Sequence, residues 1–218
     1  MTGFERPKTA QEAVLLEIRK RLLDGRLQPG QAIRPDAVGE ELGMSAVPVR
    51  EALRILEGEH QVRYRPHRGY LVTELDIKDL REIYAIRELL EAEAVRHALP
   101  NIDKSDLEEM QAAIEDMRSS DEDIFALTMA NRQFHFTIFD AADMPHLLRM
   151  VTWLWDASEP CHYRSAGFMR LENREQIDKE HRQILEAVES GDVDKVIGEL
   201  SAHRKHALAA LETDVASD

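Results

Sequence analysis

The stretch LGMSAVPVREALRILEGE, residues 42–59, sets the architecture of the N-terminal part of the chain. Ser45 is a typical helix N-cap, and a proline at position 48 is tolerated in a first turn, so a helix is predicted from there to about Glu57. At about 100° per residue, one stripe of this helix is apolar and should pack inward; it consists of Val49, Ala52, Leu53 and Leu56.

The segments around this helix predict a small unit of three helices and a hairpin. Helical periodicity covers residues 9–25 and ends at a glycine, a Pro-Gly turn follows, and a short helix is expected over 35–42. After the third helix, two short strands at 62–65 and 70–72 are joined by a turn that contains Pro66 and Gly69. This order of elements is typical of a winged helix-turn-helix.

The outward face of the third helix is suited to nucleic acid. Val47, Arg50 and Arg54 share this face, and arginines beside a helix N-terminus suit phosphates and guanine edges in a major groove. The predicted hairpin adds a basic wing, formed by Arg63, Arg65, His67 and Arg68. The alternative is that the helix arginines are solvated or pair with Glu51 and Glu57.

The distribution of charge indicates two domains. The chain has 218 residues and a net charge of −14. Residues 1–72 carry 12 basic and 10 acidic side chains, whereas the remainder carries 16 and 32. Such asymmetry hints at two functions, although an acidic helical surface also arises by chance. We place the domain boundary between residues 73 and 74.

Three quoted segments carry a family resemblance: GRLQPGQAI (25–33), LGMSAVPVREALRILEGE (42–59) and VRYRPHRGYLV (62–72). They resemble the DNA-binding domain of GntR-family transcriptional regulators, and the acidic remainder resembles the ligand-sensing FCD domain of the FadR subfamily. The family usually has Arg-Thr where Ala46 and Val47 stand, so one expected contact is missing and Val47 could instead touch a thymine methyl group. The DNA-binding residues that we expect are Arg34, Ser45, Val47, Arg50, Arg54, His67 and Gly69.

Residues 74–218 are expected to form an all-helical bundle with a core of its own. Helical periodicity predicts helices over 76–98, 104–118, 122–141, 144–157, 170–190 and 192–212. Breaks are expected at Pro100, Pro145, Pro160 and Gly191. The overall class is therefore mainly α, with a small β hairpin confined to the N-terminal domain.

Three histidines lie on the apolar stripes of three different helices in this bundle. His135 is one turn after Asn131, while His181 and His203 lie on the last two helices. Polar groups on core stripes are costly unless they are paired, so these rings either form ordinary core hydrogen bonds or converge on one metal ion. Imidazole suits zinc and nickel, and helical bundles commonly hold such sites. His206 is expected to point away from this stripe.

The resemblance to the FCD domain sharpens this hypothesis. The metal-binding members carry Asp or Asn four residues before a histidine, a second histidine after a glutamate, and a third on the last helix. These positions match Asn131, His135, His181 and His203. An asparagine in place of the more usual aspartate is a neutral, weaker ligand that leaves the site more positive, which favours an anionic ligand.

Arg87 is the other anomaly, because its helix stripe is otherwise apolar. It either forms a structural salt bridge to Glu88, Glu91 or Glu93, or it clamps the carboxylate of an effector. An R-x-x-L/I-E pattern opens FCD domains, which implies a pocket role here. Arg174, seven residues before His181, is a second candidate for effector binding.

Together these features predict a homodimeric transcriptional regulator, most often a repressor in this family, that binds a palindromic operator. A divalent metal, zinc or nickel, and a small organic or sugar acid would bind in its helical domain. The alternatives are a metal-free anion pocket and, less favoured because no nucleophile with its base is evident, a metal-dependent enzyme. The longest apolar run has five residues, the start is unlike a signal peptide and the chain has one cysteine, so a cytoplasmic protein without a membrane span is expected.

Overall fold

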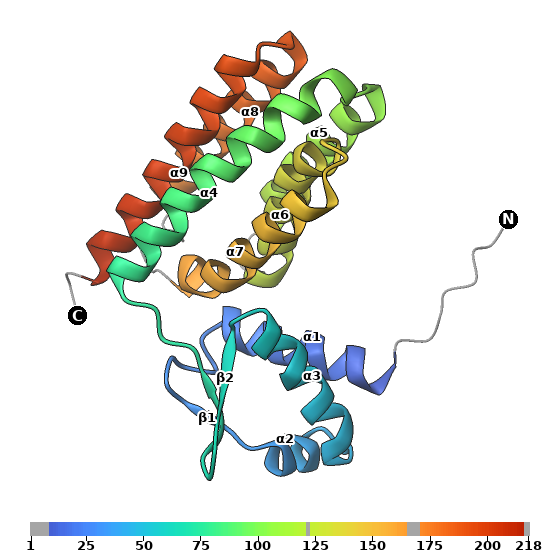
Figure 1. The fold of residues 1–218 in the computed structure, drawn as a ribbon, viewed down its shortest axis with the longest axis vertical. Coiled ribbons are helices and arrows are strands. Elements are labelled where there is room, and N and C mark those ends of the chain that lie inside the picture. The colour runs from blue at the N-terminus through green and yellow to red at the C-terminus, as the bar shows by residue number, and fades with distance from the viewer. Residues whose placement is uncertain (1–8, 121–122, 165–170, 216–218) are drawn as a thin grey trace, which may run out of the picture. The chain divides into compact units, whose positions relative to one another are not determined.

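The computed structural model describes residues 9–120, 123–164 and 171–215. The chain divides into two compact units, one that ends at Glu74 and one that begins at Leu75 (Figure 1). The first consists of three helices and a small sheet, and the second consists of helices. The mainly helical fold class expected from the sequence is confirmed.

The N-terminal unit contains α1 (Ala10–Leu23), α2 (Pro35–Glu41) and α3 (Ala46–Gly58). Its antiparallel sheet has the order β1 (Ala32–Ile33), β3 (Gly69–Val72), β2 (Val62–Arg65). The two hairpin strands were expected, but β1 was not. Two residues are too short a run for periodicity to reveal, and only the burial of Ile33 marks this strand.

The predicted inward stripe of α3 forms the centre of this unit. Val49, Ala52, Leu53 and Leu56 are completely buried. They pack in one cluster with apolar side chains of α1 and of the sheet, among them Val14, Ile18, Leu22, Ile33, Val62 and Val72. Ser45 occupies the N-cap position of α3 with an extended backbone, but its side chain makes no capping hydrogen bond.

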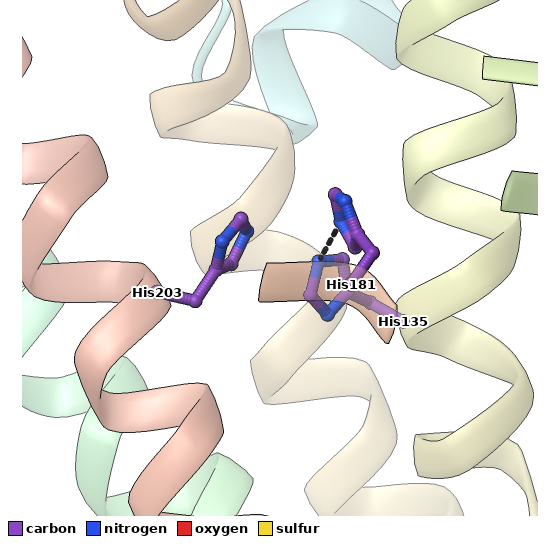
Figure 2. A group of neighbouring side chains, drawn as sticks. All are labelled: His135, His181 and His203. Carbon is purple, nitrogen blue, oxygen red and sulfur yellow. Dashed lines mark hydrogen bonds between the residues drawn. The ribbon is translucent and has the colours of Figure 1, made fainter. Parts of the chain in front are cut away.

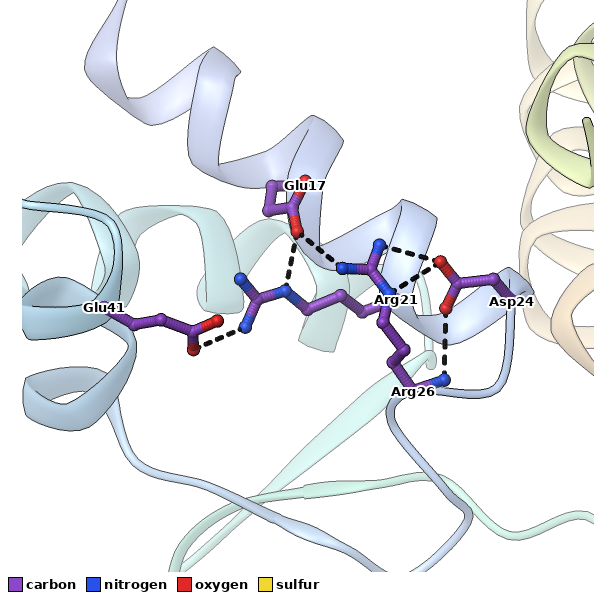
Figure 3. Close-up of polar contacts among 5 residues, drawn as sticks. All are labelled: Glu17, Arg21, Asp24, Arg26 and Glu41. Atoms are coloured by element: carbon purple, nitrogen blue, oxygen red, sulfur yellow. Dashed lines mark hydrogen bonds and ion pairs between the residues drawn. The ribbon is translucent and has the colours of Figure 1, made fainter.

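A network of ion pairs connects α1 to α2 on the surface of this unit (Figure 3). The Arg21 guanidinium donates through Nε to Glu17 and through Nη1 to Glu41, both at 2.8 Å. Arg26 pairs with Asp24 at 2.7 Å and reaches the same Glu17 oxygen at 3.2 Å. Because Arg21 is largely buried and binds carboxylates on two helices, it fixes the end of α2 against α1.

The turn between α2 and α3 depends on Gly39. A Cβ at this position would lie 2.8 Å from the backbone oxygen of Met44 and 3.3 Å from that of Ser45. The Met44 amide donates to the Gly39 carbonyl at 2.8 Å, which holds the start of α3 close to α2. Only a residue without a side chain permits this approach, so Gly39 sets the geometry of the helix-turn-helix.

We predict that Gly39→Ala destabilises the N-terminal unit by about 1–3 kcal/mol, because the contacting atoms are backbone atoms that must shift. Gly58→Ala is the matched control, since a Cβ at this helical position meets nothing within 4 Å. It should be about 0.5–1 kcal/mol more stable than the wild type. Denaturant unfolding followed by circular dichroism measures both, and equal stabilities of the two variants would contradict the role of Gly39.

The C-terminal unit contains α4 (Ile77–Ala98), α5 (Lys104–Ser119), α6 (Ile124–Asp140), α7 (Pro145–Arg164), α8 (Leu171–Ser190) and α9 (Val193–Val215), with a short 3₁₀ turn at Leu99–Asn101. In Figure 1, α4 has α9 along one side and α7 along the other, and α5 packs on α6 and α8. Asp76 and Asp103 form capping boxes that begin α4 and α5.

One expected helix break was wrong. Pro160 lies inside α7, which continues to Arg164. An internal proline removes one helical hydrogen bond, but Pro160 is buried, so tertiary packing outweighs this local cost. Within the described parts of the chain, no helix combines the length and apolar character that a membrane crossing requires.

Candidate functional site

Three buried imidazole rings meet in the C-terminal unit (Figure 2). His135 comes from α6, His181 from α8 and His203 from α9, and each is less than 9 % exposed. One ring nitrogen of each lies within 4.8 Å of those of the other two. The Nε2 atoms of His135 and His181 are 3.3 Å apart. The expected convergence of these three side chains is therefore present in the structure.

Burial keeps two of these rings uncharged. The pKa of His135 and that of His181 lie well below the ordinary value for histidine. Desolvation is the larger cause, and the charge of the neighbouring His203 is the second. The arginines at positions 87 and 204 add to this effect on His135. A neutral imidazole is the form that binds a metal ion, so the site presents these rings in the required protonation state.

Glu180 orients the third ring. Its Oε2 atom lies 2.7 Å from Nδ1 of His203, while its Oε1 atom accepts from Gln176 and lies 3.0 Å from Nδ1 of His206. Although burial opposes ionisation, the hydrogen bonds from His203 and Gln176 hold the pKa of Glu180 below its ordinary value. A carboxylate on one nitrogen of a histidine fixes the direction of the other, as is usual around metal ligands.

His206 is outside the group of three converging histidines, as expected, but it binds the carboxylate that orients His203. Glu180 was not expected, although its position directly before His181 could have drawn attention to it.

Asn131 lies one turn before His135 on α6 and lines the same pocket as His135 and His203. Within the described structure, Nδ1 of His135 is a buried nitrogen without a hydrogen-bond partner. A donor set of three imidazoles with an amide oxygen nearby suits a borderline metal ion such as zinc or nickel. The residues present therefore fit a metal ion. Because the amide of Asn131 is neutral, it would not offset the positive charge of that ion.

Arg87 lies in the same pocket and is engaged by a buried carboxylate. Its Nε atom donates to Glu91 at 2.8 Å, so the expected salt bridge forms with one of the three glutamates considered. Glu91 is 1 % exposed and also binds Arg204 and, at 2.8 Å, the indole nitrogen of Trp155. The Arg87 guanidinium stacks 4.1 Å from the centroid of the Trp155 ring.

The residues that line this pocket include two arginines, Arg87 and Arg204, and two carboxylates, Glu91 and Glu159. Two guanidinium groups share a single carboxylate, and attraction to both arginines keeps the pKa of Glu91 below its ordinary value despite its burial. Arg204 was not expected from the sequence, although it follows His203 directly. Arg174, the second candidate for effector binding, lies half-buried on α8 and is not among the residues that line this pocket.

The residues expected to contact DNA lie on the surface of the N-terminal unit. Arg34, Ser45, Val47, Arg50 and Arg54 are exposed, and Val47 is 61 % exposed although it is apolar. Arg50 pairs with Asp36 at 3.2 Å rather than with the glutamates of its own helix. Both side chains are more than half exposed, so this pair is weak and leaves Arg50 available to a phosphate or a base.

The tip of the hairpin requires unusual backbone angles. His67 and Gly69 have φ values of 65° and 78°, in the left-handed region. Glycine adopts this region without strain, whereas His67 does so at some cost, which is typical of a turn that is maintained for function. The tip lines a broad surface groove together with Arg34 and the start of α2.

Comparison with known proteins matches both units. Residues 10–72 match the model of bacterial regulatory proteins of the gntR family, and residues 82–206 match the FCD domain. The chain belongs to the GntR family. It is a DNA-binding transcriptional regulator, and the FCD match contains the three histidines, Arg87 and Arg204.

Individual members of the family are similar along most of the chain. The HTH-type transcriptional regulator McbR of Escherichia coli is 33 % identical over 168 residues, which are 76 % of each protein. The structure of E. coli McbR/YncC superposes with a TM-score of 0.81 and 28 % identity, covering 94 % of this chain and 98 % of that one. The gluconate operon transcriptional repressor of Bacillus subtilis is 31 % identical over 150 residues, 67 % of this chain and 59 % of that protein.

The buried histidines of this GntR-family regulator predict a pH dependence of stability. Because the folded-state pKa of His135 and His181 is lowered, the unfolded chain takes up protons that the folded chain does not as pH falls below about 6.5. Stability of the chelator-treated protein should therefore be complete above that pH. Below it, each of the two rings should cost up to about 1.4 kcal/mol per pH unit.

Denaturant unfolding between pH 7.5 and 5 measures this slope. His135→Gln removes one of the two groups and should make the slope shallower, whereas His97→Gln, at an exposed position, should leave it unchanged. A wild-type stability that stays constant over this range would show that the rings are not buried in neutral form.

Proposed function

We propose that this GntR-family regulator is a metal-dependent sensor of a small organic or sugar acid. We expect it to act as a repressor. The observation that carries the proposal is the meeting of three imidazoles from three helices within 4.8 Å. Residues 1–73 would bind a palindromic operator as part of a homodimer, and residues 74–218 would hold the metal and the effector. We place the protein in the cytoplasm.

The metal would be held by His135, His181 and His203, with Asn131 as a fourth donor. When bound, a zinc or nickel ion supplies a Lewis acid with open positions for an anionic oxygen. Glu180 supports this assignment, because it fixes His203 from the side away from the shared space. We assign the ion to recognition rather than to catalysis, in keeping with a family of regulators.

The effector would be an acid because Arg87 and Arg204 lie in the same pocket as two of the histidines. Guanidinium groups bind carboxylates in a bidentate manner, and here the two arginines share one internal carboxylate. A ligand that binds one conformation of the protein more tightly than another shifts the equilibrium between these conformations. The size of the shift is set by the difference between its affinities for the two conformations. Arg174 would act further out, if the effector extends toward α8.

The DNA-binding face generates one prediction. Arg50→Ala should weaken binding to a duplex selected from a random library by the wild type, by about tenfold or more, and should reduce the slope of log affinity against log salt by about one. Arg182→Ala, an exposed arginine of α8, is the control that should change neither quantity. Equal affinities of the wild type and Arg50→Ala across a salt titration would remove Arg50 from the interface.

The proposed metal site generates a second prediction. Protein purified without a histidine tag and treated with chelator should bind one Zn²⁺ or Ni²⁺ per chain in calorimetry. His203→Ala should lose at least about 100-fold in affinity, while the exposed His97→Ala should keep it.

A thermal-shift screen of carboxylates and sugar acids then addresses the effector. The proposal predicts an acid that raises the melting temperature of the metal-loaded protein and has no effect after chelation. An acid that stabilises the chelated protein equally well would establish a metal-free anion pocket instead.

A further inference from the structure

The first turn of α3 presents an apolar side chain to solvent. Val47 is the second residue of this helix and is 61 % exposed, more than the other large apolar side chains described as exposed in the N-terminal unit. Its neighbours Ala46 and Pro48 are short and half-buried. In the described structure Val47 lies outside the buried cluster of this unit, and valine is a poorer helix former than alanine. Neither packing nor helix propensity therefore accounts for a valine here.

Val47 lies at the centre of the outward face of α3. At about 100° per residue, it points about 180° away from the buried stripe of the helix. Arg54, two turns later, is almost in line with it, and Arg50 and Glu51 flank this line on its two sides. Val47 is therefore directed toward any surface that this face contacts.

A helix-turn-helix places this face in the major groove of DNA. In that motif the N-terminal residues of the second helix contact base edges, while other side chains contact phosphates. The chain is a DNA-binding regulator of the GntR family, and α3 is the second helix of its helix-turn-helix. As the second residue of α3, Val47 belongs to the part of the helix that approaches the bases.

The chemistry of valine leaves one suitable partner on a base edge. Its side chain has no hydrogen-bonding atom, so placing it against a donor or an acceptor would remove water from that group without replacing the hydrogen bond. The apolar group that the standard bases present in the major groove is the C5-methyl group of thymine. 5-Methylcytosine presents the same group at the same position of the ring.

We propose that Val47 recognises the C5-methyl group of a pyrimidine at one position in each half of the operator. This assignment deepens the proposed function and rests on its DNA-binding face. In this arrangement Arg50 contributes to affinity, whereas Val47 determines which base is preferred at one position.

Replacing thymine by deoxyuridine tests this assignment, because it removes the methyl group and leaves every hydrogen-bonding atom of the base in place. The full-length wild type selects a duplex from a random library, and each thymine of that duplex is then replaced in turn. We expect one thymine in each half at which the replacement weakens binding about fourfold, the effect of exposing one methyl group. Fluorescence anisotropy at a fixed salt concentration measures the affinities, since phosphate contacts vary steeply with salt.

A double-mutant cycle assigns the methyl contact to Val47. Val47→Ala should bind the thymine and deoxyuridine duplexes with equal affinity, and the thymine duplex about fourfold less tightly than the wild type does. Arg50→Ala, on the same face, is the matched control; it should weaken the binding of both duplexes and keep the fourfold difference between them. Because Val47 is exposed and alanine favours a helix, Val47→Ala should keep the melting temperature of the wild type.

Cytosine derivatives identify the source of the methyl group. At the sensitive position, a pair of 5-methylcytosine with guanine should bind the wild type about fourfold more tightly than a pair of cytosine with guanine. Val47→Ala should bind these two duplexes equally. A thymine–adenine pair that binds more tightly than the methylated cytosine pair assigns the contact to thymine, and the reverse order assigns it to methylated DNA.

The outcomes separate this inference from the proposed function. Equal wild-type affinities for the selected duplex and for all its deoxyuridine and 5-methylcytosine variants would overturn the inference, and so would a fourfold difference that persists in Val47→Ala. Either result would leave the palindromic operator standing. A sensitive thymine in only one half of the duplex, whose effect is lost in Val47→Ala, would support the methyl contact and contradict the palindromic operator.

Discussion

The burial of three imidazoles is the constraint on which the helical unit depends. His135, His181 and His203 replace apolar side chains at the centre of a bundle, where a polar group without a partner costs free energy. The structure meets part of that cost with the contact between two rings and with the carboxylate of Glu180. A metal ion shared by the three rings would offset more of it. In the proposed sensor, stability and metal binding would depend on the same atoms.

The second constraint is the pairing of buried charges beside these rings. Glu91 is almost completely inaccessible and is held by two arginines and an indole. A buried carboxylate is stable only with such partners, so Glu91 has a structural role. Arg87 and Arg204 share this one carboxylate. The hypothesis of a structural salt bridge for Arg87 is therefore confirmed, and its binding of an acid stays a proposal.

Much of the fold could be predicted from the sequence because it depends on periodicity. The buried stripe of α3 and the stripes that carry the three histidines follow from spacing alone, since burial on a helix repeats every three to four residues.

The proline in α7 shows the limit of prediction from spacing, because tertiary packing overrides a local preference for a break. The strand at Ala32–Ile33 is too short for any period. Glu180 and Arg204 adjoin predicted residues, yet their roles depend on side-chain directions across three helices. Arg174 is not among the residues that line the pocket, because helical phase does not fix which neighbour a side chain meets.

The most direct measurement is X-ray absorption spectroscopy of the zinc- or nickel-loaded protein, which reports the ligands of the ion itself. We expect the outer-shell scattering of three imidazoles per metal, with the remaining first-shell ligands being oxygen atoms, and two imidazoles after His203→Ala. A spectrum with one imidazole or none, or one that His203→Ala leaves unchanged, would contradict a metal held between α6, α8 and α9.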